Sequence, residues 1–469
     1  MKDFLKAFLS FGLATSIEKL IGFIILPIYT RYFNSVDYGI IDMIGTFLAV
    51  LSIFGLLQFE TSLQRYYYQS NIVRKKLLVS AIYFWVICFS LIMGLVIYIA
   101  APFMSLYFFK SKEYMWMIRT LSFQLLLTNL SILGLIVLRF EKENAKFLFV
   151  ILVKVLFSLL SVYLLVIKFK IGMMGVFYAQ VFSLLFSTIL VTFFVRRFFV
   201  FRLSQTFTKK SIRYSLPQIP ARIGSVLLGN ANRFFMLGYL SLAAIGIYSV
   251  SLKLASSIQL VNSAFIMAWT PFLYTQFKKE NNKIIFSNVF PLICGVTFLF
   301  VCLLSLFSKE IVILLTTEDF YSSYKYVGGL TLFFSLYIIK ETVDIGPRIM
   351  EKTKFLTYTF ALSLIVNLLS LYFFIRIYEL EGVIFSMIIT NLFLVIISWI
   401  VSNKLYYIPF NPYTFILLLF PALSLVITIM YVDINLGYRS TIGFLCVIFY
   451  SGLLYRFYRN FIVIINKQE

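Results

Sequence analysis

The chain has 469 residues, of which 61% are hydrophobic and 19% aromatic, with a mean hydropathy of +0.95. This composition excludes an ordinary soluble domain and indicates a multi-span membrane protein, since a helix needs about 20 apolar residues to cross a bilayer. The chain has no histidine, and its four cysteines lie in apolar runs without metal-like spacing. We therefore expect no catalytic residue, no metal and no other cofactor.

Apolar runs between charged residues or Pro, Gly and Asn predict fourteen membrane-spanning helices. They lie near 8–30, 39–64, 77–101, 114–138, 147–167, 172–195, 212–238, 243–270, 284–307, 324–347, 355–375, 382–402, 413–432 and 440–457. The first run contains Glu18, Lys19 and Pro27 and lacks a small-residue cleavage site, so we expect a retained span rather than a signal peptide. No loop is long enough for a folded domain outside the membrane.

The basic residues predict the orientation of these spans. If both termini lie on one side, the loops on that side carry 25 Lys and Arg residues and the opposite loops carry 9. The positive-inside rule therefore places both termini in the cytoplasm, and it explains most of the net charge of +22 without a nucleic-acid partner. Seven basic residues lie well inside the predicted spans, away from their ends: Lys19, Arg119, Lys154, Arg222, Arg233, Lys253 and Lys340.

Two halves of the chain are similar. The motif that begins with Arg139-Phe-Glu-Lys returns as Arg348-Ile-Met-Glu-Lys, at an offset near 208 residues. Six spans per half give both halves the same orientation, with a pseudo-twofold axis along the membrane normal. We expect an all-α integral membrane protein with an N-lobe at 1–207, a C-lobe at 208–405, and two further helices with a basic tail at 406–469.

The basic residues within the spans predict a wet, cationic cavity. A charge in hydrocarbon costs about 2.5–3.5 kcal/mol on insertion scales, so such residues usually face a bundle interior. One face of the seventh span carries Gln218, Arg222, Ser225, Gly229 and Arg233. The arginine forks suit phosphate or carboxylate oxygens, which makes this face a candidate anion-binding wall. The alternative is that both arginines reach the membrane interfaces, as we expect for Arg119 and Lys154.

Two further spans extend the predicted substrate site. Span eight carries Ser249, Lys253, Ser256, Gln259 and Ser263 on one face, with Lys253 near mid-depth. Span one places Lys19 on a polar stripe. The candidate residues for binding a diphosphate or glycan are Lys19, Arg222, Arg233, Lys253, Gln218 and Gln259.

Carboxylates within the spans are candidates for ion coupling, because such groups often act as relays. Asp42 and Glu60 are eighteen residues apart, which would place them on one face of span two. Lys340 and Asp344 are four residues apart and are expected to neutralise each other. The candidate coupling residues are Glu60, Glu341 and Asp42.

Several blocks in order along the chain carry a family resemblance: 18–31 (EKLIGFIILPIYTR), 37–39 (DYG), 214–220 (YSLPQIP), 232–235 (NRFF), 245–255 (IGIYSVSLKLA), 268–272 (AWTPF) and 351–354 (EKTK). With them the chain resembles the polysaccharide transporter branch of the multidrug/oligosaccharidyl-lipid/polysaccharide exporter superfamily, which includes Wzx-type O-antigen and capsule flippases. The resemblance implies two six-helix lobes plus two helices in the bacterial cytoplasmic membrane. It also implies transport of undecaprenyl-diphosphate-linked oligosaccharide to the periplasmic or outer leaflet, by alternating access through the cationic cavity.

Other functions remain open at this point. A peptidoglycan lipid-precursor flippase suits a cationic cavity equally well. A multidrug exporter would more naturally use carboxylates for cationic drugs, and a membrane-bound glycan polymerase usually has a large periplasmic loop. The partners that the resemblance implies are a lipid-linked oligosaccharide, membrane lipids, a glycan polymerase and a chain-length regulator.

Overall fold

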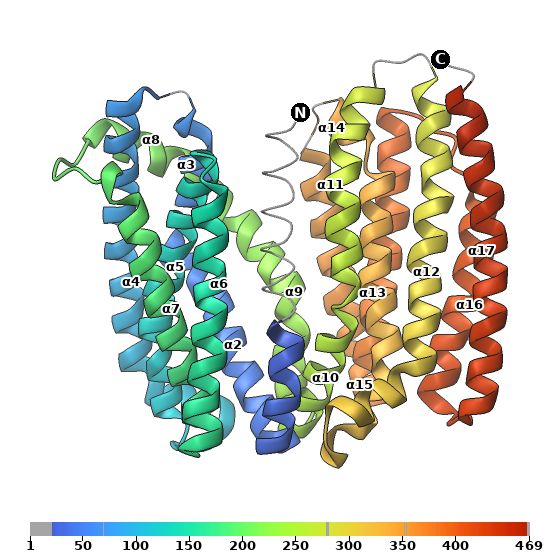
Figure 1. Cartoon of the computed structure of the whole chain (residues 1–469), viewed down its shortest axis with the longest axis horizontal. Helices are drawn as coiled ribbons and strands as arrows, with labels where there is room; N and C mark the ends of the chain where they lie inside the picture. The colour runs from blue at the N-terminus through green and yellow to red at the C-terminus, as the bar shows by residue number, and fades with distance from the viewer. Residues whose placement is uncertain (1–20, 69, 278–280, 351, 353, 467–469) are drawn as a thin grey trace. The chain divides into compact units, whose positions relative to one another are not determined.

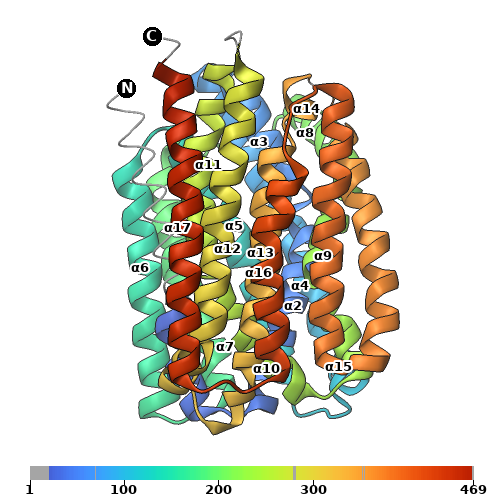
Figure 2. The same cartoon turned by 90° about the vertical axis from the view of Figure 1, so that its right-hand side faces the viewer.

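The computed structural model describes residues 21–68, 70–277, 281–350, 352 and 354–466, which form helices and no strand (Figures 1 and 2). The chain divides into two compact units, Met1–Arg233 and Phe234–Glu469, so this division falls inside a helix. The lobe boundary at 207/208 and the internal repeat stay predictions.

Unit 1 is built from helices in the following chain order. They are the described segment Ile21–Tyr32, α2 (Ser35–Leu56), α3 (Phe59–Tyr67), α4 (Ile72–Phe109), α5 (Met115–Phe140), α6 (Asn144–Val162), α7 (Met173–Val195), α8 (Gln205–Ser215) and α9 (Ile219–Tyr239), whose last turns belong to unit 2. Side-chain caps start two of the long helices. The Asn34 side chain accepts a hydrogen bond from the Asp37 N–H, and Asn71 caps α4 in the same way. A core that includes Leu63, Leu78 and Val137 packs α3 against α4 and α5.

Unit 2 continues with α10 (Leu242–Ala255), α11 (Ile258–Gln276), α12 (Asn282–Leu315), α13 (Tyr324–Val343), α14 (Gly346–Ile349), α15 (Lys354–Leu405), α16 (Pro412–Tyr431) and α17 (Leu436–Asn466). Figure 2 shows α16 and α17 beside α12, against which both helices pack. The core of this unit includes Phe290, Phe298, Leu336 and Val383. Buried apolar side chains on α12, α13 and α15 therefore hold the unit together.

The surface of the long helices is apolar where they do not touch one another. Along α4, Leu91, Ile92, Leu95 and Ile99 are all more than half exposed. A run of exposed apolar side chains along a long helix is typical of contact with lipid. The structure thus supports the multi-span membrane architecture.

Nine helices of the described residues are long and apolar enough to cross a membrane, or ten if the bent pair α10 and α11 forms one span. The predicted all-α membrane fold is confirmed, but the count of fourteen is not. Neither α9 nor α13 is among the nine, and the spans predicted at 355–375 and 382–402 form α15. A break at Glu379 (φ 48°, ψ −121°) interrupts α15.

The prediction of one continuous second span at 39–64 is wrong. Leu57 and Gln58 both have left-handed backbone angles, with φ of 46° and 59°, and they separate α2 from α3. A helix loses its phase across two such residues. Asp42 and Glu60 therefore lie on two helices, and the five-turn argument that placed them on one face does not apply.

Candidate functional site

Two helix breaks meet inside unit 1 and position the start of α9. The first is the left-handed pair Leu57 and Gln58, and the second is the 3₁₀ turn Leu216–Gln218, which contains Pro217. The Ser215 hydroxyl joins them by donating a buried 2.9 Å hydrogen bond to the Gln58 carbonyl. A proline removes one backbone donor and disfavours a regular helix before it, so the sequence itself creates the second break. This junction fixes the end of α8, just before α9, against the break between α2 and α3.

Arg233, which we predicted as a substrate residue, pairs with Asp42, which we predicted as a coupling residue. Arg233 Nε lies 2.5 Å from Asp42 Oδ2, and Nη2 lies 3.4 Å from Oδ1. The arginine fork thus meets both carboxylate oxygens, and Nη1 donates to Asn230 at 3.4 Å. Arg233 is only 9% exposed, so this ion pair neutralises a charge that is largely withdrawn from solvent.

Glu60 and Arg222 form the second acid–base combination of unit 1. Glu60 opens α3 just after the first break, and its Oε2 is buried without a hydrogen-bond partner among the described residues. Arg222 is exposed on the first turn of α9, near enough for its charge to act on Glu60. Each arginine of the predicted anion-binding face therefore has a carboxylate from the α2–α3 region opposite it.

The remaining polar positions of α9 lie as follows. Ser225 and Gly229 are exposed on the same helix as Arg222, and the Gln218 side chain donates to the Tyr214 carbonyl at 2.9 Å. Gln218 lies in the 3₁₀ turn before α9 rather than in the α-helix. The predicted stripe is therefore helical from Arg222 to Arg233. Lys19 lies outside the described residues.

The predicted stripe of span eight is divided by a bend. Helices α10 and α11 meet at an angle of 44° at Ser256 and Ser257. Ser256 Oγ donates to the Lys253 carbonyl at 2.6 Å, and the next amides bond three residues back. Such side-chain bonds compete with the helix ladder and bend helices without proline or glycine. Lys253 therefore lies in the last turn of α10 and Gln259 in the first turn of α11. The prediction that both residues lie on one face of a single straight helix is wrong.

Both residues are half-buried in unit 2. The Gln259 carboxamide oxygen accepts a 3.2 Å hydrogen bond from Asn262. A broken helix in a membrane protein leaves backbone groups available beside a cavity and is often associated with substrate or ion sites. The bend thus gives Lys253 and Gln259 a local structure that suits polar ligands, although the sequence indicated only their spacing.

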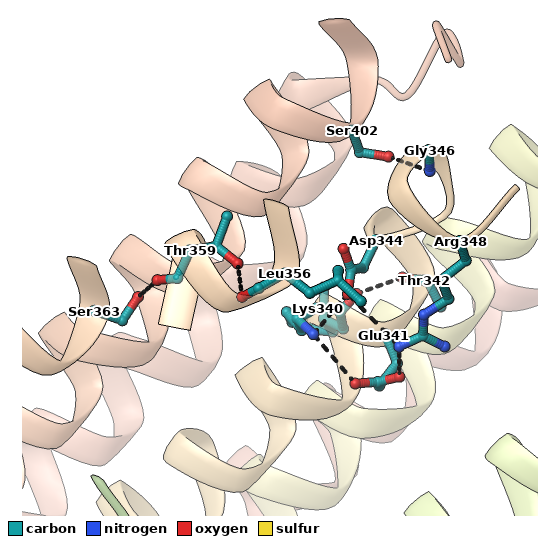
Figure 3. Close-up of polar contacts among 11 residues, drawn as sticks. Lys340, Glu341, Thr342, Asp344, Gly346, Arg348, Leu356, Thr359, Ser363 and Ser402 are labelled. Atoms are coloured by element: carbon teal, nitrogen blue, oxygen red, sulfur yellow. Dashed lines mark hydrogen bonds and ion pairs between the residues drawn. The ribbon is translucent and has the colours of Figure 1, made fainter. Parts of the chain in front are cut away.

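A second charged cluster lies in unit 2, where α13 ends and α14 begins (Figure 3). Lys340 Nζ lies 2.6 Å from Asp344 Oδ2, which confirms the predicted i, i+4 pair. Glu341 pairs with Lys340 at 3.5 Å and with Arg348. Lys340 and Asp344 are 2% and 1% exposed. These four residues, here called the α13 cluster, therefore form a balanced set of two positive and two negative charges, of which only Arg348 is partly exposed.

Neighbouring helices complete the surroundings of the α13 cluster. The Lys340 ammonium lies 4.6 Å from the centre of the Phe360 ring, a favourable cation–π distance. The Gly346 N–H donates to Ser402 Oγ at 2.8 Å, as Figure 3 shows. A Cβ at Gly346 would stand 2.4 Å from the Ser402 carbonyl oxygen, so only glycine allows α14 to approach α15 this closely. The sequence does not predict Arg348 as a partner of Glu341, because Arg348 lies between the predicted spans 324–347 and 355–375.

A third cluster surrounds Glu141 at the turn between α5 and α6. Its carboxylate accepts hydrogen bonds from Lys75 at 3.0 Å and from the Tyr67 hydroxyl at 2.9 Å. Arg197 contacts both Glu141 and Glu143. Burial alone would raise the pKa of Glu141, but the bonds from Lys75 and Tyr67 and the charges of Lys75 and Arg197 hold it below its ordinary value. The cluster joins α3, α4 and the segment after α7.

Long apolar helices with an exposed apolar surface and paired charges between them define a multi-span integral membrane protein with a polar interior. The sequence of residues 4–276 matches the model of the polysaccharide biosynthesis protein family. This match covers more than half of the chain, and the protein belongs to that family. No curated protein sequence matches the chain.

The fold is that of MOP superfamily transporters. The structure superposes on the lipid II flippase MurJ in an inward closed conformation with a TM-score of 0.69 and 16% identity, covering 95% of this chain and 98% of MurJ. An inward-facing multidrug resistance MATE family transporter gives a TM-score of 0.64 and 13% identity, covering 82% and 94%. A MOP superfamily transporter from Pyrococcus furiosus gives 0.52 and 16%, covering 86% and 95%. At these identities the similarity establishes the fold.

Proposed function

We propose that this protein is a flippase that moves an undecaprenyl-diphosphate-linked oligosaccharide to the periplasmic or outer leaflet of the cytoplasmic membrane. The observation that carries the proposal is the family match over residues 4–276. The transporter fold is compatible with it. In this proposal the protein is not an enzyme. Its task is to carry a polar glycan and an anionic diphosphate through hydrocarbon, while the polyprenyl tail stays in lipid.

The basic residues supply the interactions that this cargo loses on leaving water. An anionic headgroup without water or counterions is costly in a low-dielectric medium. Arg222 is exposed on α9, and Lys253 is half-buried at the bend of α10. We propose that they bind the diphosphate, with Gln218 and Gln259 contacting polar groups of the cargo. Their location in a common central cavity, and alternating access through it, are part of the same proposal.

The ion pair between Asp42 and Arg233 suggests how binding would be coupled to an ion gradient. While ionised, Asp42 occupies the fork of Arg233. Protonation of Asp42 would release that fork for the diphosphate, and loss of the proton would restore the pair and help to expel the cargo. Glu60 would act on Arg222 in the same way. Glu341 is less suited to this role, because it already pairs with both Lys340 and Arg348.

The test is flipping of a fluorescent lipid-linked oligosaccharide in proteoliposomes, with export of surface glycan in cells as a second readout. Arg222→Ala and Lys253→Ala should block transport at normal protein abundance, and reversal to Glu should be at least as severe. Arg222→Lys and Lys253→Arg should keep part of the activity, although lysine loses the bidentate fork. Lys210→Ala is the matched control, since Lys210 is an exposed basic residue of α8. Normal transport by both alanine variants would overturn the proposed anion site.

A peptidoglycan lipid-precursor flippase is the second candidate, favoured by the extent of the superposition on MurJ. The two candidates differ in cargo. Depletion of the protein should cause lipid-linked oligosaccharide to accumulate at the cytoplasmic face, and mass spectrometry would identify its glycan. Accumulation of lipid-linked peptidoglycan precursor instead would favour the second candidate.

The orientation is also proposed rather than observed. With both termini in the cytoplasm, a cytoplasmic reporter fused after Lys209 and a periplasmic reporter fused after Ser322 should both be active. Twenty-five loop bases on one predicted side, against nine on the other, determine this expectation. Labelling of both positions from the same side of the membrane would contradict the proposed topology.

A further inference from the structure

An apolar groove lies within unit 1, where the segment between α7 and α8 passes across α4. Figure 1 shows this segment at the same end of the unit as α3 and α8. The groove has a volume of about 290 Å³. Its apolar lining comes from α4, α5 and the connecting segment, and consists of Tyr83, Phe84, Ile87, Leu130, Phe199, Val200 and Phe201. It is too small and too apolar for an oligosaccharide.

Hydrogen bonds hold the connecting segment in place, so the groove is a built feature of unit 1. Ser80 Oγ donates to the Phe198 carbonyl at 3.3 Å and accepts from the Val200 N–H at 2.8 Å. Phe199 packs edge-on against Tyr83, with ring centroids 4.9 Å apart. The next residue but one, Phe201, is nevertheless fully exposed.

One polar group in the lining lacks a partner. Tyr83 is 4% exposed, and its hydroxyl makes no hydrogen bond with any described residue. Buried hydroxyl groups are normally satisfied, so an exception requires an explanation. This hydroxyl lies beside Gly134 of α5, where an added Cβ would stand 3.0 Å from it, so the packed helices enclose it and it does not face the groove.

Two exposed arginines, Arg196 and Arg202, lie next in sequence to the lining of the groove without lining it themselves. Thr192 also lines the groove, and Arg196 follows it by four residues, one turn further along the same helix face. Arg196 is exposed and lies 4.1 Å from the centre of the Phe193 ring. Arg202 follows Phe201 directly and is exposed. Among the described residues neither forms an ion pair, in contrast to Arg197, which pairs with two glutamates.

We propose that this groove binds an anionic membrane phospholipid, with part of one acyl chain against Ile87 and Leu130 and the phosphate beside Arg196 and Arg202. The combination of an apolar channel, an exposed aromatic ring and two unpaired guanidiniums matches a lipid that carries a net negative charge at the headgroup. The acyl chain of a zwitterionic lipid would fill the groove, but its headgroup carries no net negative charge to neutralise the two arginines. This proposal is separate from the proposed substrate site, because none of these residues is a proposed substrate residue.

The experiment is native mass spectrometry of the full-length protein in detergent, after incubation with equal amounts of phosphatidylglycerol and phosphatidylcholine of the same chain length. The wild-type protein should retain phosphatidylglycerol preferentially. The double variant Arg196→Gln/Arg202→Gln should lose that preference by about fivefold per arginine. The matched control is Lys209→Gln/Lys210→Gln, which removes the same charge from exposed positions of α8 and should keep the preference.

A second pair of variants tests the apolar part of the groove. Ile87→Phe adds volume to the groove and should reduce retention of both lipids, without changing the ratio between them. Ile92→Phe is its control, since Ile92 lies on the same helix, is 57% exposed and does not line the groove. Equal loss of preference in the arginine and lysine double variants would show a diffuse surface attraction and overturn the proposal. So would unchanged retention in the Ile87→Phe variant.

Discussion

Replacing Lys340 by methionine tests whether the α13 cluster stabilises unit 2. Lys340 lies 2.6 Å from Asp344, and both side chains are almost completely buried. Methionine keeps the length of the side chain but leaves the Asp344 carboxylate without its close counterion. Removing one partner of a buried pair typically costs about 3–5 kcal/mol, mostly as the penalty of an uncompensated charge. Arg348 Nη2 lies 3.6 Å from Asp344 Oδ2 and partly compensates that charge. We therefore expect the free energy of unfolding to fall by about 3 kcal/mol, the lower end of this range, with a small contribution from the lost contact with Phe360.

The double variant Lys340→Met/Asp344→Leu separates this effect from simple packing damage. It removes both charges of the closest pair and leaves the pair between Glu341 and Arg348 in place. Replacing a buried ion pair by apolar residues of similar volume is often nearly neutral. The double variant should therefore recover most of the stability lost by Lys340→Met, giving a coupling free energy of about 2–4 kcal/mol.

The assay is unfolding of the purified protein by a denaturing detergent, followed by the fluorescence of Trp269 and Trp399, both of which belong to unit 2. Variants in which Trp85 and Trp116 are replaced by Phe would restrict the signal to that unit. Ordinary surface substitutions change the free energy of unfolding by up to about 0.5 kcal/mol. A change no larger than this in the Lys340→Met variant would refute the argument from burial. Additive losses in the double variant would refute the argument from pairing.

Three further predictions follow from the paired charges and from one close helix contact. Asp42→Asn and Arg233→Met should each lower the free energy of unfolding of unit 1 by about 1.5–3 kcal/mol. The exchange Asp42→Arg/Arg233→Asp should recover part of that lost stability, and no recovery would indicate that the position of each group matters rather than its charge. The pKa of Glu141 lies below its ordinary value of about 4.5, so its ionised form adds stability above that pH and the contribution is lost as the pH falls through the lower folded-state pKa. Unfolding below that pH should therefore depend less on pH in Glu141→Gln, and equal pH profiles would contradict this. Gly346→Ala should cost about 1–3 kcal/mol, because its Cβ would stand 2.4 Å from a carbonyl oxygen of α15, whereas the control Gly452→Ala, with open space around it, should be neutral or slightly stabilising.

The local pattern of apolar residues is sufficient to predict the class of fold. Runs such as 77–101 and 284–307 are apolar enough to require lipid or a core around them, and α4 and α12 are found there. The same reasoning failed at the second span. Nothing in the apolar run from Ile53 to Phe59 signals a break, because it contains no proline and its only glycine, Gly55, lies before the left-handed pair Leu57 and Gln58.

The bend between α10 and α11 was missed for a related reason. Serine is tolerated in membrane helices, and only the bond from Ser256 to the Lys253 carbonyl shows that it interrupts this one. A serine side chain can thus leave a helix regular or bend it by bonding to the backbone, and tertiary packing decides which of the two occurs.

By itself the sequence determined an all-helical membrane protein with charged residues inside its spans, since apolar length and residue spacing are properties of a continuous stretch of chain. It also determined the pair of Lys340 and Asp344, whose partners lie one helical turn apart. Only the tertiary structure decided that Arg233 binds Asp42, which lies 191 residues away. Helical periodicity defines which face a charge occupies, but the partner on another helix depends on where each helix breaks and how the segments pack. The sequence therefore showed which charges needed a counterion, and the contact of α2 with α9 determined which counterion Arg233 received.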